Sequence, residues 1–305
     1  MPATPRFHRL GVAVLAYTVF VILFGAWVRI TGSGAGCGEH WPTCHGEIVP
    51  RTPTLATIIE FTHRTTSGLC LVAVLALLIA AARAFPRGHA ARRGAALSVL
   101  FTVTEALLGA GLVIFGLVDK DDSIGRAVMM ALHLVNTSLL TGALTFTVWS
   151  SRGPSEPGGE RPANAGLWLG GAIVGLLLVG VSGAVTALGD TLYPVGGANE
   201  GAGAHFLQRL RAFHPFIAVG VGLYVLHVAH TLSGPHAAPA VRRWGGLVML
   251  GVIVQVAAGV VNILLSAPGW LQIVHLLLGT GLWIAVVYFS LHVLGPRALA
   301  PRRAR

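Results

Sequence analysis

Four histidines occupy matching places in two similar stretches of the sequence. His63 matches His214 and His133 matches His275, and all four fall just inside the ends of long apolar runs. An ionisable side chain at that depth in a membrane is costly and usually functional. Two neutral imidazoles on facing helices can bind a haem iron as axial ligands. We therefore predict two pairs of metal ligands for haem iron, His63 with His133 and His214 with His275.

Other chemistry fits these histidines less well. A zinc site usually takes three or four protein ligands, and each pair would supply only two. Covalent attachment of a c-type haem requires the motif Cys-x-x-Cys-His, which does not occur in the sequence. Four unrelated histidines held by interhelical hydrogen bonds are the alternative, but their matching positions favour ligation.

Glu60 adds a carboxylate beside the first pair. It precedes His63 by three positions, so both side chains project from one face of a helix. Such a carboxylate can take protons or stabilise positive charge on an oxidised substrate, and we predict a catalytic group of Glu60, His63 and His133. A capping role in the first helical turn is the alternative. Arg211 stands three residues before His214, so the second pair is predicted only to bind a cofactor.

Three arginines near the histidines suggest how a haem is oriented. An iron held about one turn inside the membrane leaves the propionates near the interface, where arginine is a suitable bidentate partner. The predicted cofactor-binding arginines are Arg64, Arg209 and Arg211, with snorkelling to the interface as the alternative. Glu105 matches Gln255 between the two stretches, and it is predicted either to hydrogen-bond across the bundle or to relay protons.

Two cysteines lie close together in the first large loop. Cys37 and Cys44 are predicted to face an oxidising compartment, which makes a short-range disulfide plausible. A metal site that also uses His40 and His45 is the alternative. Cys70 lies within an apolar run and is interpreted as a small apolar filler.

Long apolar segments must position these residues. The chain is 54% hydrophobic and 10% charged, with a mean hydropathy of +0.74, whereas soluble domains carry about 25% charged residues. Its net charge of +10 does not indicate nucleic-acid binding, because the arginines form short clusters between apolar runs and no basic stripe. The prediction is an all-α integral membrane protein in a lipid bilayer, with eight transmembrane helices at about 10–30, 58–82, 94–117, 127–149, 166–187, 209–232, 243–266 and 271–294.

Charge also predicts the topology. Segments on one side hold most of the 21 basic residues, so both termini are predicted to be cytoplasmic and the histidines to lie near the outer face of the cell membrane. The first run is too long for a signal peptide and is predicted to be retained. The polar, Pro- and Gly-rich stretch 150–165 predicts a cytoplasmic linker. Matching residues on either side indicate a duplication, with tandem four-helix bundles at 1–149 and 166–305 and pseudo-two-fold symmetry along the membrane normal.

The residues collected above resemble those of the haem A synthase family. The similarity lies in three segments and extends more weakly over nearly the whole chain. The segments are Thr31-Gly32-Ser33-Gly34 through Cys37, Trp41-Pro42 with Cys44-His45-Gly46, and Ile59-Glu60-Phe61-Thr62-His63-Arg64. The resemblance implies a membrane oxidoreductase that converts a ring methyl group of haem O to the formyl group of haem A.

The resemblance also implies roles for the two halves. The first half would hold haem O as substrate, and the second would hold haem b as a cofactor. Cys37 and Cys44 would form the outer-loop disulfide of the family. Haem O synthase would supply the substrate, a haem-copper oxidase would receive the product, and an unidentified electron acceptor would complete the reaction. Pro215 departs from the pattern, because Arg64 follows the matching His63, and a proline should kink the helix or mark its first turn.

Two further functions fit part of the sequence. A membrane electron-transfer protein with two haems would use the same four histidines without modifying either haem. Glu60 in one half only, together with the cysteine loop, favours the enzyme. A transporter with histidines along a proton or substrate path is the third possibility, and a purified protein without haem absorbance would favour it.

Overall fold

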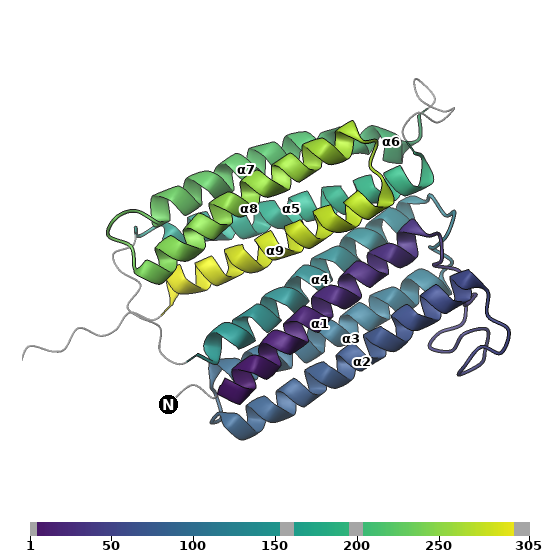
Figure 1. Ribbon diagram of the computed structural model, residues 1–305, viewed down its shortest axis with the longest axis horizontal. Helices are drawn as coiled ribbons and strands as arrows, with labels where there is room; N and C mark the ends of the chain where they lie inside the picture. The colour runs from purple at the N-terminus through teal and green to yellow at the C-terminus, as the bar shows by residue number, and fades with distance from the viewer. Residues whose placement is uncertain (1–4, 153–161, 195–203, 296–305) are drawn as a thin grey trace, which may run out of the picture.

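Eight apolar helices, each long enough to cross a membrane, run along the long axis of the computed structural model (Figure 1). The structure describes residues 5–152, 162–194 and 204–295. Within them the regular structure is helical, apart from an isolated bridge between Cys44 and Glu47. The helices are α1 (Pro5–Ile30), α2 (Leu55–Ala84), α3 (Ala90–Ile114), α4 (Ile124–Ser150), α5 (Ala165–Leu192), α6 (Phe206–Arg211), α7 (Phe213–Leu232), α8 (Pro239–Leu264) and α9 (Gly269–Leu294).

The predicted spans agree with these helices, and the all-helical membrane fold is confirmed. The run predicted at 209–232 differs, because it contains the end of α6 and all of α7, with a break at Ala212. Pro215 lies in the first turn of α7, where its missing N–H leaves no hydrogen bond unmade. Residues 153–161, which make up most of the predicted linker, and 296–305 at the C-terminal end lie outside the described residues.

The helices form two groups of similar arrangement. Helices α1 to α4 contact one another in a ring, and α5, α7, α8 and α9 do the same. The groups meet through α4 with α5, α4 with α9, and α1 with α9. Figure 1 shows the groups side by side, with α6 and the first loop (residues 31–54) at one end, here called the loop end. A duplicated bundle would have this contact pattern.

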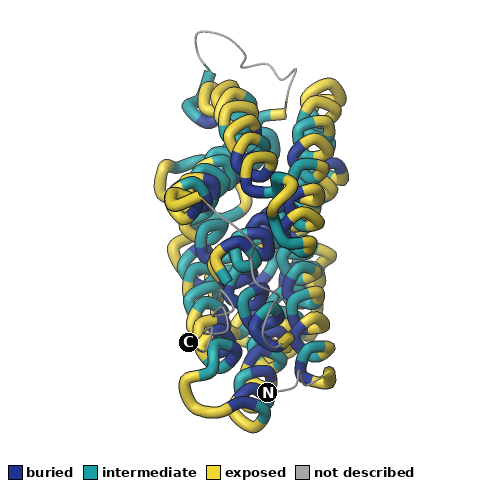
Figure 2. Tube along the Cα trace, turned by 90° about the vertical axis from the view of Figure 1, so that its left-hand side faces the viewer, coloured by how far each residue is buried: buried dark blue, intermediate teal, exposed yellow. Residues whose placement is uncertain are grey.

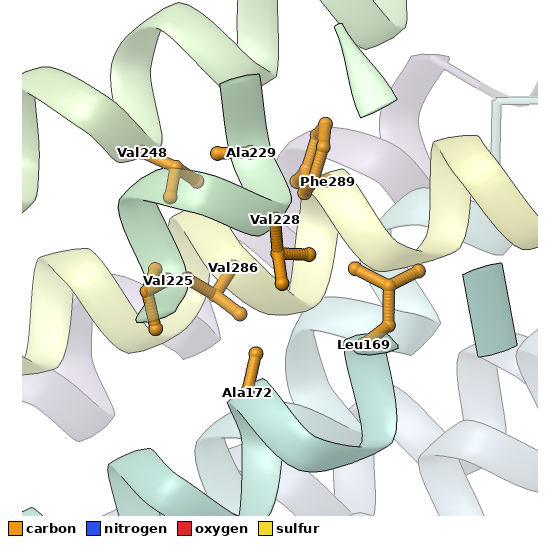
Figure 3. A pocket seen from close by; sticks show the side chains of 8 residues that line it. All are labelled: Leu169, Ala172, Val225, Val228, Ala229, Val248, Val286 and Phe289. Atoms are coloured by element: carbon orange, nitrogen blue, oxygen red, sulfur yellow. The ribbon is translucent and has the colours of Figure 1, made fainter. Parts of the chain in front are cut away.

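Apolar side chains fill the interior of each group and also cover its surface. Figure 2 shows buried residues inside the helix layers and exposed residues on their outer faces. Leu167 and Phe216 are 76% and 78% exposed, and lipid would cover such surfaces. Figure 3 shows side chains of α5, α7, α8 and α9 converging in the second group. All of them are hydrocarbon, so this point is hydrophobic packing and not a polar site.

Hydrogen bonds join the two helix groups near the loop end. The Arg29 guanidinium of α1 donates to the Ala187 carbonyl of α5 at 2.6 Å and to the Gln272 side chain of α9 at 3.0 Å. The Tyr193 hydroxyl donates to the Asp122 carboxylate, and this hydrogen bond lowers the pKa of Asp122. These contacts fix the relative position of the groups where the four histidines lie.

Candidate functional site

His63 on α2 and His133 on α4 form a pair inside the first group. Both are half-buried, and they lie close enough to interact electrostatically. Gly25 of α1 leaves room for one ring, since a Cβ at that position would lie 3.1 Å from Cε1 of His63. The Phe24 ring contacts the His63 ring edge-on, with 5.8 Å between centroids. The two rings therefore lie within electrostatic range of each other, and their role as ligands of one iron stays a prediction.

Glu105 of α3 stands behind His133. Its Oε1 lies 3.3 Å from Nδ1 of His133, although the two are not aligned as a hydrogen bond. Asn136 and Thr137 of α4 donate hydrogen bonds to the same carboxylate. Thr104 in turn donates to the side-chain oxygen Oδ1 of Asn136 at 2.6 Å. Glu105 therefore hydrogen-bonds across the bundle, which confirms one of its two predicted roles.

His214 on α7 and His275 on α9 form the second pair, also within electrostatic range. The Ser182 hydroxyl of α5 lies 2.9 Å from Nδ1 of His214. A Cβ on the neighbouring Gly183 would lie 3.1 Å from Cε1 of the same ring. The side-chain amide of Gln255 in α8 lies 3.1 Å from Nε2 of His275. Each pair thus has a glycine against its first ring and a polar side chain behind its second.

Both carboxylate oxygens of Glu60, the predicted catalytic residue, have partners within the protein. Helix α2 begins at Leu55 with Thr54 as its N-cap, so Glu60 is not in the first turn, and the alternative capping role is wrong. The residue is 3% exposed. Its Oε2 accepts a hydrogen bond from the backbone N–H of Cys37 at 2.8 Å, and its Oε1 forms an ion pair with Arg64.

Arg64 connects α2 to the first loop. Besides its ion pair with Glu60, it donates to the carbonyl oxygens of His40 and Thr43 at 2.6 and 2.7 Å. Gly36 packs so closely on α2 that a Cβ there would collide with the Ala56 backbone. The loop is therefore held firmly against the N-terminal end of α2. A contact of Arg64 with a haem propionate stays a prediction.

The second group has a carboxylate that sequence reasoning overlooked. Asp190 of α5 lies 3.2 Å from the Arg211 guanidinium of α6. No fixed spacing links Asp190 to His214, and its position at the end of an apolar run was the only available signal. Arg209 lies on the same short helix as Arg211. Propionate binding by these two arginines also stays a prediction.

The cysteine pair of the first loop is oxidised. Cys37 and Cys44 form a disulfide, and Cys70 is a buried free thiol within hydrogen-bonding distance of Thr18. The disulfide sulfurs are not available as thiolate ligands, so the alternative metal site that includes them is wrong. His45 is instead 2.9 Å from the Gly36 carbonyl oxygen through its Nε2. The described residues contain no cluster of three side chains placed to hold a metal ion.

Comparison with known proteins identifies similar chains. Residues 8–287 match the family model described as cytochrome oxidase assembly protein, COX15-CtaA. The chain is 49% identical over 298 residues to a protoheme IX farnesyltransferase of Thermus thermophilus, a match that covers 95% of this chain and 48% of that protein. The chain thus spans about half the length of this relative.

Two shorter matches are to proteins named heme A synthase. The protein of Halalkalibacterium halodurans is 46% identical over 98 residues, which cover 32% of this chain and 33% of the relative. The protein of Shouchella clausii is 38% identical over 125 residues, covering 41% and 39%. The family match is therefore broad, whereas these named relatives are similar over a limited region.

Proposed function

The chain belongs to the COX15-CtaA family of cytochrome oxidase assembly proteins, and we propose from this that it is a haem A synthase. In the proposed reaction a ring methyl group of haem O is oxidised to the formyl group of haem A. The two interhelical histidine pairs carry the proposal. The relatives named heme A synthase support it.

The residues of both pairs suit an iron porphyrin. Nδ1 of His63 and of His275 is buried without a hydrogen-bond partner, which is unusual for polar atoms and is relieved when a ligand engages the ring. Gly25 and Gly183 leave space against one imidazole of each pair. When bound, haem b would supply one-electron transfer at the second site.

The two halves would divide the work. In the proposal, residues 1–149 hold the substrate between His63 and His133, and residues 166–305 hold haem b between His214 and His275. The stretch 150–165 joins them. Glu60 is the candidate carboxylate beside the substrate. Arg64 donates to Oε1 and the N–H of Cys37 donates to Oε2, so Glu60 would act on the substrate through the remaining lone pair of Oε2 or after it exchanges a partner.

The partners follow from the chemistry of substrate and product. A haem O synthase would provide the farnesylated substrate, and a haem-copper oxidase would take up the product. The Thermus relative is about twice as long as the matched region and is named a farnesyltransferase, which supports a close association with the synthase. The electron acceptor belongs to an unidentified redox partner. We place both termini in the cytoplasm, with the histidine pairs toward the outer face of the cell membrane.

Expression of the chain together with a haem O synthase tests the proposed activity. Extraction of membrane haems should yield haem A or hydroxylated haem O, which are absent when the synthase is expressed alone. A chain that binds two haems but forms neither product would instead be an electron-transfer protein. Absence of both products in the presence of abundant haem O contradicts the proposed enzyme.

The glycines beside the rings provide a second prediction. Gly183→Ala should place a Cβ against the His214 ring, and overpacking of this kind costs about 1–3 kcal/mol. Haem retention at the second pair should then fall by about tenfold or more. Gly170→Ala, in the same helix with open space around it, is the matched control and should keep full haem content. Equal haem content in both variants, measured per chain by absorbance, would show that Gly183 does not shape the site.

A further inference from the structure

The polar side chains behind the second histidine of each pair differ in charge and in the ring nitrogen that they face. Glu105 faces Nδ1 of His133, whereas Gln255 faces Nε2 of His275. Both come from the helix that precedes the histidine's own helix in the chain. The two groups therefore place polar side chains at opposite ring nitrogens of equivalent histidines, a carboxylate in the first group and an amide in the second.

The carboxylate is held in place more firmly than a lone side chain would be. Asn136 donates to Glu105 and also to the Phe101 carbonyl oxygen at 2.8 Å. Thr137 donates to the other carboxylate oxygen and simultaneously lies 2.8 Å from the His133 carbonyl oxygen. With two donors already bound, Glu105 has a fixed orientation toward the ring. A small rotation of His133 would align its Nδ1–H with the carboxylate and leave Nε2 for a ligand.

We propose that Glu105 is a positioning residue that sets the redox chemistry of the first pair. A carboxylate behind a ligating histidine fixes its tautomer and raises its basicity, and loss of such a partner typically weakens metal binding by 10- to 100-fold. The more basic ligand favours ferric over ferrous iron. The amide of Gln255 lacks this charge, so the iron at the second pair is easier to reduce. The inference rests on the proposed haem sites.

The difference in reduction potential between the two sites fits the proposed roles of the two halves, substrate oxidation in the first and electron transfer in the second. A lower potential at the site where the substrate is oxidised would let electrons pass from that iron to the iron of the second pair. An iron that is more readily reduced belongs at the site that receives and passes on electrons. The difference in charge arises at one pair of matching positions, Glu105 and Gln255.

The experiment measures two midpoint potentials in one protein. The purified full chain in detergent is loaded with two equivalents of iron protoporphyrin IX and titrated against redox mediators, with absorbance as the readout. A His214→Ala chain identifies the titration wave of the second pair. Glu105→Gln should raise the potential of the first-pair haem alone. Each tenfold selective loss of ferric affinity corresponds to about 59 mV for a one-electron couple.

Two further variants keep the test decisive. Gln255→Glu should lower the potential of the second-pair haem, and it serves on its own if Glu105→Gln fails to fold. Thr102→Val is the matched control, because Thr102 donates to the Ser98 carbonyl oxygen of its own helix at 2.7 Å, and it should move neither potential. Unchanged potentials in Glu105→Gln, or an equal shift in the control, would overturn the inference. A wild-type chain that takes up no haem would overturn the proposed function itself, and the inference with it.

Discussion

Replacement of His63 by alanine should reduce formation of oxidised haem by more than about 100-fold while haem stays bound at the second pair. In the proposed site this change would leave His133 as the one protein ligand to the substrate iron, and a loss of orientation of this kind is expected to exceed the 10- to 100-fold effect of supporting residues. The reciprocal change, His214→Ala, should remove the resident haem. Haem content and extracted products, measured on the same preparations, separate the two effects.

A histidine outside the pairs provides the control for both variants. His230 lies at the opposite end of α7 from His214 and is exposed, so His230→Ala should retain both haem content and product. If His63→Ala and His230→Ala behave alike, the first pair does not hold the substrate. Loss of both haems in each single variant would likewise contradict two separate sites.

Glu60→Gln should lower product formation by about 10²- to 10⁴-fold, the usual contribution of a general acid or base, without loss of bound haem. The amide keeps the shape of the side chain and can still accept from the N–H of Cys37, so the first loop should stay in place. Product measured against bound haem gives the readout. Unchanged turnover would show that Glu60 has no catalytic role and only binds the first loop to α2.

Glu60→Ala should in addition destabilise the protein. It leaves the Arg64 guanidinium without its carboxylate in a largely buried position, and breaking a buried ion pair costs about 3–5 kcal/mol. Glu47→Ala is a matched control, because Glu47 forms an exposed ion pair with Arg51 four residues later in the same region. Exposed pairs contribute about 0–1 kcal/mol. Thermal unfolding in detergent should distinguish the variants, and equal melting temperatures would contradict a stabilising role for Glu60.

The sequence predicted those features that depend on composition and repetition. Long apolar runs define the spans because the bilayer requires a minimum length of uninterrupted hydrocarbon. The match of His63 to His214 and of His133 to His275 predicts the two pairs, since a duplicated bundle would place equivalent residues in equivalent surroundings. The disulfide was expected from two cysteines within a short loop, and the structure confirms it.

Features that arise from tertiary packing were not predictable in this way. Arg29 spans the two helix groups, and nothing in its local sequence indicates partners so distant in the chain. Asp190 pairs with Arg211 across a loop, which again depends on how the helices meet. The apolar run predicts that α2 begins at residue 58, which is three residues late. Leu55, Ala56 and Thr57 belong to the helix but precede the most hydrophobic part of the run. That small error put Glu60 in the first turn, where a capping role looked reasonable.

The haem inventory of the purified chain tests the central claim most directly. The protein, isolated from cells that make haem O, should show the absorbance of low-spin iron with two imidazole ligands, approaching two haems per chain. Extraction should yield haem b together with haem O or its oxidised products. A folded protein that binds no haem, or that keeps its full haem content when all four histidines of the two pairs are replaced, would contradict the account.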